Sequence, residues 1–413
     1  MDTITVLAGR RLILGVTGSI AAYKAADLAS KLTQAGALVD VVMTDAARQF
    51  ITPLAFQAVT GRPVYTSMWT ADSSGGLPTH IAHVGLGEGA DLLVVAPCTA
   101  QTLARLAHGL ADDLLSVTAL AARCPLLLAP AMDGGMYAHP AVQANIEALR
   151  ARGALVIEPD EGRFASGLAG RGRLPETPAL IGHIRRTLGR AGALAGRRAV
   201  VTAGGTSEPI DPVRYVTNRS SGRQGYALAQ AALDAGADVT LISAARGLPA
   251  PIGAVVVPVE TAREMLDAVL AHLPGADLLL MAAAVADFTP ADTAAHKIKK
   301  SGTDGLTLRL APTADILAEV QRARQATGFP RVVVGFAAES ENLLENARAK
   351  LERKGLDLLV ANDITAPEAG FAVETNRVTI LDAEGGQQPL ALMSKTQVAE
   401  IVVERAAAWL GRR

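Results

Sequence analysis

Aromatic residues and cysteine are scarce in this chain of 413 residues. Phe, Trp and Tyr together make up 3% of it, and the two cysteines, Cys98 and Cys124, each lie in an apolar context. Two such cysteines argue against a disulfide framework and suit a reducing cytoplasm. No apolar run reaches the roughly 18 residues that a membrane span needs, and the start, MDTITVLAGR, lacks the layout of a signal peptide. We therefore expect a cytoplasmic protein without a membrane partner.

An excess of charge of one sign is also lacking. The formal net charge is −1, so bulk electrostatics do not favour nucleic acid or a membrane surface as a partner. Lysine is rare and unevenly placed, because five of the 8 lysines fall between positions 297 and 354. The five are Lys297, Lys299, Lys300, Lys350 and Lys354. Such a cluster is either a solvated face or a place that needs compact, strongly hydrated charge, and composition leaves both interpretations open.

Two stretches of the chain, each long enough for a domain, repeat one local pattern. A strand, a helix and a second strand are predicted at 11–17, 18–36 and 37–43, and again at 198–202, 222–236 and 237–243. A strand, a glycine-rich turn, a helix and a strand form the β-α-β unit that places helix N-terminal amides against a phosphate. Each half therefore predicts a phosphate-binding turn.

Further strand-like runs follow in each half, with helical periods between them. They read DLLVVAP and PLLLAP in the first half, and DLLLMAA, RVVVGFA and DLLVA in the second. Both halves therefore predict doubly wound, mostly parallel α/β domains of the Rossmann or flavodoxin-like kind. The boundary is expected within the small, basic stretch 188–198, which gives domains 1–190 and 191–413.

The two glycine-rich turns differ, and neither is diagnostic alone. In GVTGSIAA the helix follows Gly18 directly, whereas residues 205–221 separate the corresponding strand and helix of the second half. Neither turn has the lysine of a P-loop, and GVTGSIAA lacks the full dinucleotide spacing. A mononucleotide-type phosphate is the ligand that the first turn predicts.

Longer motifs carry a resemblance to a known family. They read GVTGSIAAYKA, HVGLGEGADLLVVAPCTA and PAMDGGMYAHP in the first half, then VTAGGTSEPIDPVRYVTNRSSGRQG, AAAVADFTP with HKIKK, and VGFAAE with ARAKLERKGLDLLVAND. In their order and their split across two halves, they resemble the bifunctional coenzyme A biosynthesis family over nearly the whole chain. In that family phosphopantothenoylcysteine decarboxylase is joined to phosphopantothenate–cysteine ligase.

For the first half, the resemblance implies a decarboxylase that binds FMN. Gly18, Ser19 and Ile20 would meet the FMN phosphate at the start of the helix. Thr44 and Thr99 would line the flavin site. Flavin can oxidise the substrate's CH₂–SH group to a thioaldehyde, which gives the electrons left by CO₂ a place to go.

Decarboxylation then leaves an enethiol, and its reduction needs a proton donor. His83, in HVGLGEGAD, matches the family's active-site histidine. Without that match, a satisfied surface histidine would be the ordinary interpretation.

For the second half, the resemblance implies a ligase driven by CTP. The carboxylate of 4′-phosphopantothenate would attack the α-phosphorus, and the cysteine amine would then displace CMP from the acyl-cytidylate. Asn218 would contact the activated carbonyl, and Lys297 would hold the phosphates as a point charge. The rest of the implied CTP site is Met281, Ala282, Ala283, Asp287, Thr313, Ala314, Asp315, Ile316, Phe336, Lys350 and Lys354. Mg²⁺ is expected with the triphosphate.

Three positions depart from the family's pattern at the implied sites. Asp112 and Asp133 stand where asparagine is usual, and Ser166 replaces a cysteine in the glycine-rich stretch GRFASGLAGRGRLPE. This stretch, residues 162–176, has no strand or helix period and predicts a loop. Gly89 and Cys98 also differ from the usual tryptophan and alanine, and we interpret both as packing changes.

The replacement of cysteine by Ser166 raises the question of the proton donor. A thiol can give a proton to a forming carbanion, and a serine hydroxyl is a far weaker acid. Asp133, in the substrate-contacting motif, is one candidate for the general acid. The alternative is that Ser166 relays a proton from water and Asp133 only accepts a hydrogen bond.

Three functions follow from these observations. They are the full bifunctional enzyme, a ligase fused to a flavoprotein that stops at the enethiol, and a ligase whose first half is only a flavin-binding scaffold. The retained His83 and the phosphate turn oppose the third, and nothing in the sequence separates the first two. The expected partners are the small-molecule substrates, and the resemblance implies a homo-oligomer, a dodecamer built from trimers of the flavin half and dimers of the ligase half.

Overall fold

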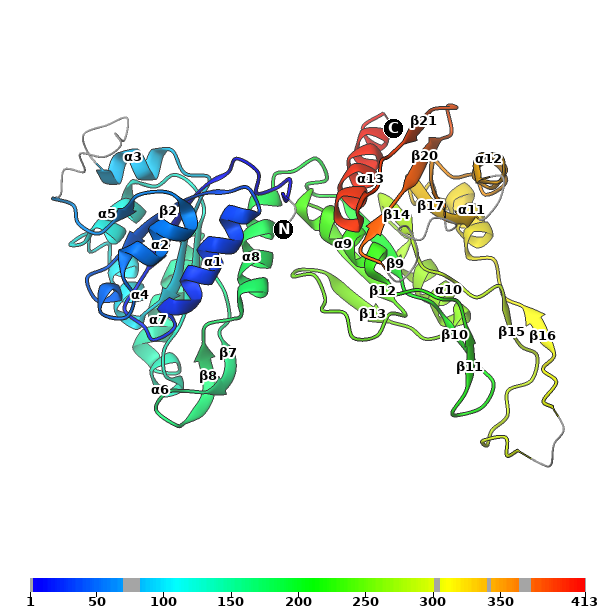
Figure 1. Cartoon of the computed structure of the whole chain (residues 1–413), viewed down its shortest axis with the longest axis horizontal. Coiled ribbons are helices and arrows are strands. Elements are labelled where there is room, and N and C mark those ends of the chain that lie inside the picture. The colour runs from blue at the N-terminus through cyan, green and yellow to red at the C-terminus, as the bar shows by residue number, and fades with distance from the viewer. Residues whose placement is uncertain (1–2, 70–81, 301–304, 340–342, 364–372, 413) are drawn as a thin grey trace. The chain divides into compact units, whose positions relative to one another are not determined.

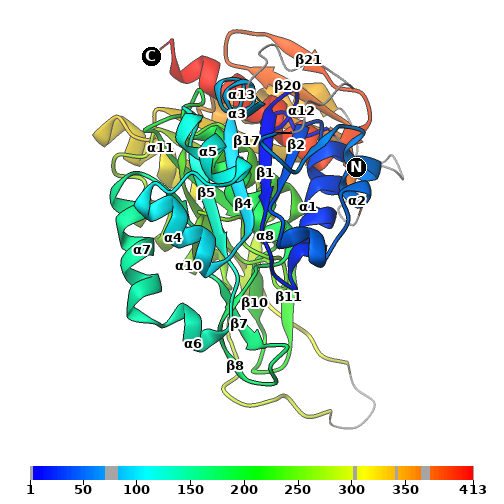
Figure 2. The ribbon, with the colours of Figure 1, turned by 90° about the vertical axis from the view of Figure 1, so that its left-hand side faces the viewer.

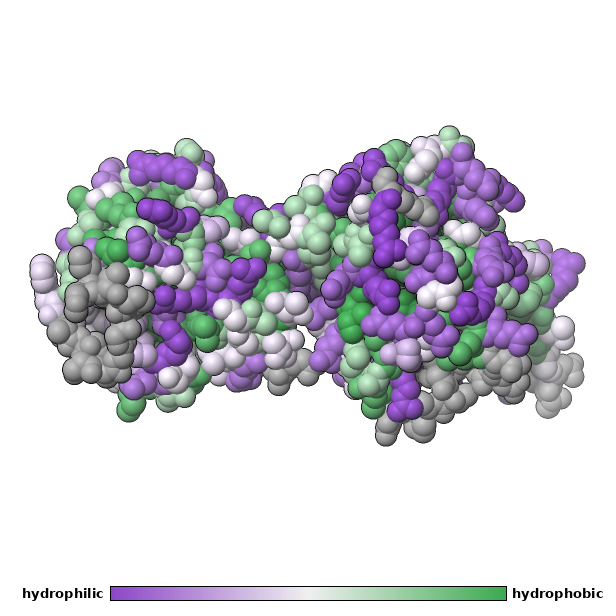
Figure 3. Space-filling view, turned by 90° about the horizontal axis from the view of Figure 1, so that it is seen from above, coloured by the Kyte–Doolittle hydropathy of each residue, from purple (hydrophilic) through white to green (hydrophobic). Residues whose placement is uncertain are grey.

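The chain folds into two compact units, Met1–Leu188 and Gly189–Arg413. The computed structural model describes residues 3–69, 82–300, 305–339, 343–363 and 373–412 (Figure 1). No helix in these ranges is long and apolar enough to cross a lipid bilayer. On the face seen in Figure 3, hydrophilic and hydrophobic side chains are interspersed over each unit, as is usual for a folded domain.

The first unit is built on a six-stranded parallel sheet in the order β3-β2-β1-β4-β5-β6. The strands are β1 (Arg11–Val16), β2 (Leu38–Met43), β3 (Val64–Tyr65), β4 (Leu92–Cys98), β5 (Leu126–Pro130) and β6 (Leu155–Val156). The order reverses between β1 and β4. Ligands of doubly wound sheets bind outside the carboxyl ends of the strands at such a switch point.

Helices cover both faces of this sheet, as Figure 2 shows. One face is covered by α1 (Ala22–Gln34), α2 (Pro53–Thr60) and α8 (Thr177–Gly189), and the other by α3 (Ala82–Glu88), α4 (Ala100–His108), α5 (Leu114–Ala121) and α7 (Pro140–Ala151). Because side chains alternate along a strand, Leu12 and Leu14 of β1 pack under α1 while Ile13 packs on the other face. Burial on both faces explains why these strands read as continuous apolar runs.

Part of the stretch 162–176 forms a β-hairpin, so the prediction of a loop was wrong for residues 162–163 and 169–173. Strands β7 (Asp160–Arg163) and β8 (Ala169–Arg173) pair antiparallel and accompany the short helix α6 (Gly134–Tyr137). At the tip, the N–H of Phe164 donates to the Leu168 carbonyl over 2.8 Å, and Gly167 adopts a φ of 86° that favours glycine. Most side chains of both strands are exposed, so no apolar period marks them in the sequence.

The second unit contains an eight-stranded sheet in the order β13-β12-β9-β14-β17-β18-β20-β21. Its six parallel strands are β9 (Arg198–Ala203), β12 (Asp238–Ser243), β13 (Val255–Pro258), β14 (Leu278–Met281), β17 (Val332–Glu339) and β18 (Leu358–Asp363). β20 (Val378–Asp382) and β21 (Gln387–Pro389) add an antiparallel edge. The prediction of doubly wound, mostly parallel α/β domains is confirmed, and the switch point here lies between β9 and β14.

Helices again cover the two faces of this sheet. α9 (Arg223–Asp234) and α13 (Lys395–Leu410) lie on one face, and α10 (Ala262–His272), α11 (Ile316–Thr327) and α12 (Leu343–Arg353) lie on the other. The long turn between β9 and α9 contains a hairpin of β10 (Ser207–Pro209) and β11 (Tyr215–Thr217). β10 packs against β15 (Phe288–Pro290), which pairs with β16 (Leu310–Pro312) (Figure 1). A last short pair joins β19 (Thr375–Asn376) to β22 (Met393–Ser394).

Candidate active sites

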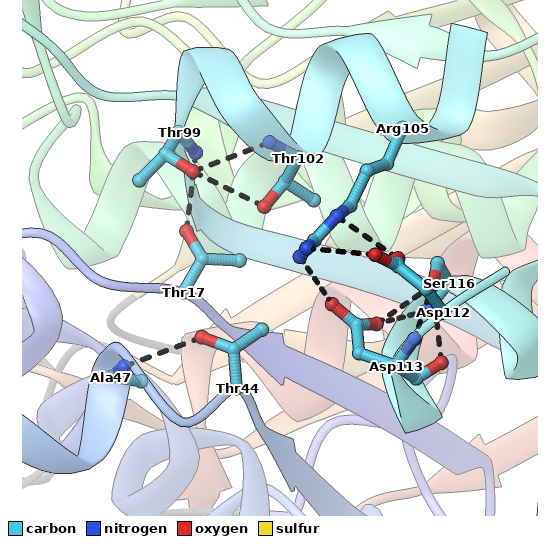
Figure 4. A network of polar contacts seen from close by, with 9 residues as sticks. All are labelled: Thr17, Thr44, Ala47, Thr99, Thr102, Arg105, Asp112, Asp113 and Ser116. Carbon is cyan, nitrogen blue, oxygen red and sulfur yellow. Dashed lines mark hydrogen bonds and ion pairs between the residues drawn. The ribbon is translucent and has the colours of Figure 1, made fainter. Parts of the chain in front are cut away.

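Three threonines follow neighbouring strands at the carboxyl edge of the first sheet (Figure 4). The Thr17 hydroxyl donates to the Pro97 carbonyl over 2.7 Å and accepts from the Thr99 N–H over 3.1 Å. This bridge ties the end of β1 to the end of β4 across the switch point. The Thr44 hydroxyl, after β2, accepts from the N–H of Ala47 over 3.3 Å. Thr44 and Thr99, both predicted for the flavin site, therefore lie along one edge.

The turn after β1 fits a phosphate. A Cβ added to Gly18 would lie 2.4 Å from the Cβ of Ala46, so glycine permits this close packing. Within the described residues, α1 begins with neither a side-chain cap nor an acidic residue in its first turn, and such a helix start favours an anion. Ile20 and Tyr23 expose apolar side chains beside it. Ser19 and Ile20 belong to this turn, and their role at the phosphate group of FMN stays a prediction.

His83 lies in the first turn of α3 and is half-buried. α3 leads back to the start of β4, so its own start lies on the side of the carboxyl edge of the sheet. His83 has no hydrogen-bond partner among the residues that the structure describes. The topology thus places His83, the predicted active-site histidine, on the side of the carboxyl edge that carries Thr17, Thr44 and Thr99. Among the described residues, His83 forms no hydrogen bond with these threonines.

Asp133 and Ser166 lie in contact. Asp133 follows β5 at the same edge, and Ser166 lies at the tip of the β7–β8 hairpin. The Ser166 hydroxyl donates to Asp133 Oδ2 over 2.8 Å, and the Gly135 N–H donates to Oδ1 over 3.1 Å. Both oxygens of this carboxyl group therefore accept hydrogen bonds, and two departures from the family's pattern meet in one place.

A cavity of about 470 Å³ adjoins this pair, between α6 and the hairpin. Asp133 lines it from one side, and Phe164 and Arg171 line it from the hairpin. The hairpin is fixed to the loop after β5, because the Met132 N–H donates to the Gly172 carbonyl over 2.9 Å and a Cβ on Gly172 would lie 2.2 Å from the Met132 carbonyl oxygen. Gly172 therefore serves close backbone packing at the hairpin's base.

Asp112 is held by an ion pair. Arg105 of α4 pairs with Asp112 at 3.0 Å and with Asp113, the N-cap of α5, at 2.7 Å (Figure 4). The positive charge of Arg105 thus compensates the negative charge of Asp112, which occupies a position where the family usually has asparagine.

Gly89 and Cys98 have packing explanations. A Cβ on Gly89 would lie 2.2 Å from the guanidinium of Arg11. Cys98 is fully buried, and this burial raises the pKa of its thiol, so it stays protonated and unreactive. Both findings agree with the interpretation from the sequence. Cys98 and Cys124 are free thiols.

The second unit has a larger cavity, of about 810 Å³, at the carboxyl ends of β14, β17 and β18. Asn218 and every residue of the implied CTP site except Lys297 line it. These are Met281, Ala282, Ala283, Asp287, Thr313, Ala314, Asp315, Ile316, Phe336, Lys350 and Lys354. Residues from positions 218 to 354 thus converge on one cavity at a position where doubly wound sheets bind ligands.

Buried threonines fix the loop that follows β14. The hydroxyl of Thr202 accepts from the Ala283 N–H over 3.1 Å, and that of Thr206 accepts from the Ala286 N–H over 2.9 Å. Asn218 Nδ2 donates to the Val285 carbonyl over 2.9 Å. The backbone that would contact a nucleotide is therefore held rigidly in place.

Two lysines place positive charge at this cavity. Lys350 Nζ donates to the Phe336 carbonyl over 2.9 Å, and Lys354 forms an ion pair with Asp315. Burial alone would raise the pKa of Asp315, but hydrogen bonds from Lys354 and the Ala318 N–H outweigh it and lower this pKa. Asp315 is therefore ionised at neutral pH and balances one lysine in the absence of an anionic ligand.

Lys297 lies outside this cavity. Its side chain is exposed, and its neighbour Ile298 is held by Asp211 and Arg214 of the β10–β11 hairpin. Lys299 and Lys300 are exposed as well. Of the five clustered lysines, the structure brings Lys350 and Lys354 to the cavity, and the role assigned to Lys297 stays a prediction.

Among the polar residues of the same cavity that the sequence analysis missed are Gln224, Asn362, Asn376 and Lys395. They come from α9, β18, β19 and the first turn of α13. Gln224 lies two residues after Gly222 in the motif VTNRSSGRQG, and this motif is the signal that could have indicated it. Asn362 lies in the motif ARAKLERKGLDLLVAND, and Asn376 and Lys395 belong to none of the quoted motifs.

The fold defines a protein of two doubly wound α/β domains in tandem. The family model "Flavoprotein" matches residues 4–189, and the model "DNA/pantothenate metabolism flavoprotein C-terminal domain" matches residues 194–410. The coenzyme A biosynthesis bifunctional protein CoaBC of Mycolicibacterium smegmatis is 46% identical over 98% of each chain. That of Bacillus subtilis is 44% identical over 97% of this chain and 98% of its own. The chain belongs to this bifunctional family, as the motifs predicted.

A solved structure of a CoaBC C-terminal domain is 35% identical, with a TM-score of 0.46. It covers 54% of this chain and 100% of its own.

Proposed function

We propose that this chain catalyses two consecutive reactions of coenzyme A biosynthesis. Residues 191–413 join cysteine to 4′-phosphopantothenate at the expense of CTP, and residues 1–190 convert the product to 4′-phosphopantetheine with FMN. The observation that carries this proposal is the full-length similarity to CoaBC proteins, at 46% identity over 98% of the chain. The convergence of the implied nucleotide residues on one cavity supports it.

In the ligase half, the backbone at 281–287 and 313–316 receives the nucleotide, and Lys350 and Lys354 neutralise its phosphates. Asn218 lies on the same cavity and would orient the carbonyl of the acyl-cytidylate. In the part of the chain that the structure describes, no group of three His, Cys, Asp or Glu side chains could hold a metal ion. Mg²⁺ would therefore be held chiefly by the triphosphate and water.

In the decarboxylase half, the turn at Gly18–Ile20 binds the phosphate of the cofactor and orients it at the carboxyl edge of the sheet. FMN, when bound there, would supply hydride-transfer chemistry for the substrate's CH₂–SH group. The carbon that loses CO₂ must gain one proton. Asp133 can deliver that proton, and Ser166 can fix the carboxyl group or pass a proton along its hydrogen bond.

Ser166 also favours a second candidate, in which the first half stops at the enethiol because its hydroxyl is a weak acid. One experiment on the full chain separates the two. 4′-Phosphopantothenate, cysteine and CTP are supplied together, and the product is weighed by mass spectrometry. Saturated 4′-phosphopantetheine supports the complete enzyme, a product lighter by two hydrogens supports the second candidate, and absence of any cysteine conjugate contradicts the ligase.

We further propose that the protein acts in the cytoplasm as a homo-oligomer, a dodecamer of the kind implied by the resemblance. Size-exclusion chromatography with light scattering tests the mass, and a monomer would contradict it.

A further inference from the structure

One wall of the second unit's cavity is not used by the proposed nucleotide site. The lining residues there include Gln224, Asn362, Asn376 and Lys395. Gln224 and Lys395 begin α9 and α13, which cover one face of the sheet, whereas Lys350 and Lys354 come from α12 and its end on the opposite face. The cavity is therefore lined from both faces of the sheet. The implied CTP residues include Lys350 and Lys354, from the α12 face, but neither Gln224 nor Lys395, from the α9 and α13 face, which is the unused flank.

Two oxygens on the unused flank lack donors. Gln224 Oε1 and Asn362 Oδ1 are fully buried atoms without a hydrogen-bond partner among the described residues. The amide nitrogen of Gln224 donates to the Lys395 carbonyl over 3.3 Å, which fixes the direction of the side chain. Buried acceptors in folded proteins are ordinarily satisfied. A ligand that brings N–H or O–H donors would satisfy these two.

Lys395 brings positive charge to the same flank. It is 6% exposed and lines the cavity beside Gln224 and Asn376. Burial lowers the pKa of Lys395, Glu374 acts in the opposite direction, and Arg223 adds to the lowering. Arg223, which pairs with Glu374, also lines the cavity, and Lys395 is the buried cation of this lining. It matches a carboxylate.

We propose that this flank binds the α-amino acid substrate of the ligase, with Lys395 on its carboxylate and the Gln224 and Asn362 oxygens on its amino group. The assignment rests on the proposed ligase function. A phosphate fits less well, because a fully ionised phosphate has no hydrogen to donate to the buried oxygens of Gln224 and Asn362. An amino acid carries both required groups on one carbon.

The two amide oxygens also suit the reaction. A neutral amine has two N–H bonds and one lone pair, so two acceptors can hold both hydrogens and leave the lone pair for the acyl carbon. Amide oxygens carry no net charge, so they stabilise the unreactive ammonium form less than carboxylates would. The C–N bond then forms as the acyl C–O bond breaks. CMP leaves with the electron pair, and the nitrogen gives one proton to solvent.

The test compares cysteine with cysteamine, which has the amine and thiol but no carboxylate. In the full chain, Lys395→Met should raise the KM for cysteine. The preference for cysteine, defined as kcat/KM for cysteine divided by kcat/KM for cysteamine, should fall by about tenfold or more. Lys395→Arg should restore part of this preference. Gln224→Met should impair both amines alike and leave the ratio unchanged. Lys31→Met, on the first unit, is the matched control.

Release of pyrophosphate from CTP and 4′-phosphopantothenate, without cysteine, serves as the second readout. It should be unchanged in all four variants. An unaltered cysteine-to-cysteamine ratio in Lys395→Met, or a rise in the KM for CTP instead, would overturn this assignment alone. A wild-type chain that releases no pyrophosphate would overturn the proposed ligase function, and this assignment with it.

Discussion

The Ser166 hydroxyl donates a 2.8 Å hydrogen bond to the carboxyl group of Asp133. The two residues are 33 positions apart, and each departs from the family's usual residue. The β7–β8 hairpin brings them together because its base is bound to Met132 and its tip reaches the start of α6. The two departures therefore form one unit, and their roles can be tested together.

Asp133→Asn should slow the final reduction by about a hundredfold, which is within the range that a general acid contributes. Enethiol should accumulate, and mass spectrometry of a single turnover measures it. Ser166→Ala removes only the partner and should keep substantial turnover. Ser166→Cys in the Asp133→Asn background should restore saturated product, since a thiol can supply the proton.

Asp133→Asn with a normal rate of saturated product would exclude Asp133 as the donor. If Ser166→Ala were the more damaging change, the relay through Ser166 would be favoured instead. Asp112→Asn is the matched control, because its carboxylate is paired with Arg105.

A helix or strand could be predicted where a short stretch of sequence carries its apolar pattern, and could not be predicted where it depends on contacts with distant segments. Strands such as β1 and β14 are buried on both faces, so apolar runs mark them. The antiparallel edge strand β21 is short and half-exposed, and nothing in its sequence distinguishes it from a loop. The same holds for β7 and β8, which the sequence analysis took for a loop.

The residues that line the cavity of the second unit fall into the same two groups, those that a local motif indicates and those that only the fold brings there. The backbone at 281–287 belongs to a continuous motif and was predicted, and the structure brings it to the cavity. Lys395 and Asn362 reach that cavity because α13 packs against α9 and the sheet order places β18 two strands from β14, and this topology is not readable from local periods. Lys297 shows the converse, because motif membership did not bring its exposed side chain to the cavity.

Gly18→Val should reduce the amount of bound flavin at least severalfold. The added side chain would meet Ala46 within 2.4 Å and push the phosphate turn away from the edge. The purified wild-type protein should be yellow, and the ratio of flavin absorbance to protein measures the loss. Gly305→Ala is the control, because no atom lies within 4 Å of a Cβ there. Full flavin content in Gly18→Val would contradict the placement of the phosphate.

Lys297→Gln should lower kcat if this lysine reaches the phosphates during the reaction, as the resemblance implies. Lys350→Met should raise the KM for CTP by about tenfold, since a charge-assisted contact is lost. Steady-state kinetics with varied CTP separates the two effects. Lys300→Gln, exposed in the same segment, is the control for Lys297. Full turnover of Lys297→Gln at saturating CTP would show that its assignment is wrong.

Asp40→Asn should destabilise the first unit. The Asp40 side chain is fully buried and pairs with Arg11 at 2.8 Å and with Arg62 at 2.7 Å. Removing one partner of a buried pair is costly, and because both arginines are partly exposed we expect a loss of about 2 kcal/mol. That corresponds to a fall of about 4–8 °C in the Tm of this unit, which calorimetry measures. Asp45→Asn, whose carboxylate is 90% exposed, should change Tm very little.

The Asp315–Lys354 pair should make the stability of the second unit depend on acid pH. The pKa of Asp315 is lower in the folded chain than its usual value, because hydrogen bonds from Lys354 and the Ala318 N–H outweigh the effect of burial. A carboxyl group with a lowered pKa stabilises the fold above its unfolded pKa, about 3.9, and loses that contribution as pH falls through the folded value. The pair is partly exposed, so the contribution should be under about 1 kcal/mol.

Urea unfolding followed by Trp fluorescence measures this difference. Trp409 of α13 is 6% exposed and should report the second unit, whereas Trp69 is already 86% exposed. Asp315→Asn should be less stable than the wild type between pH 5 and 7 (about 1 to 3 units above the usual Asp pKa), and the gap should close as pH falls below about 4. Asp292→Asn, with an 85% exposed carboxylate, should show no such gap. A difference between Asp315→Asn and wild type that stays constant down to acid pH would mean that the ionised carboxylate is not what Lys354 stabilises.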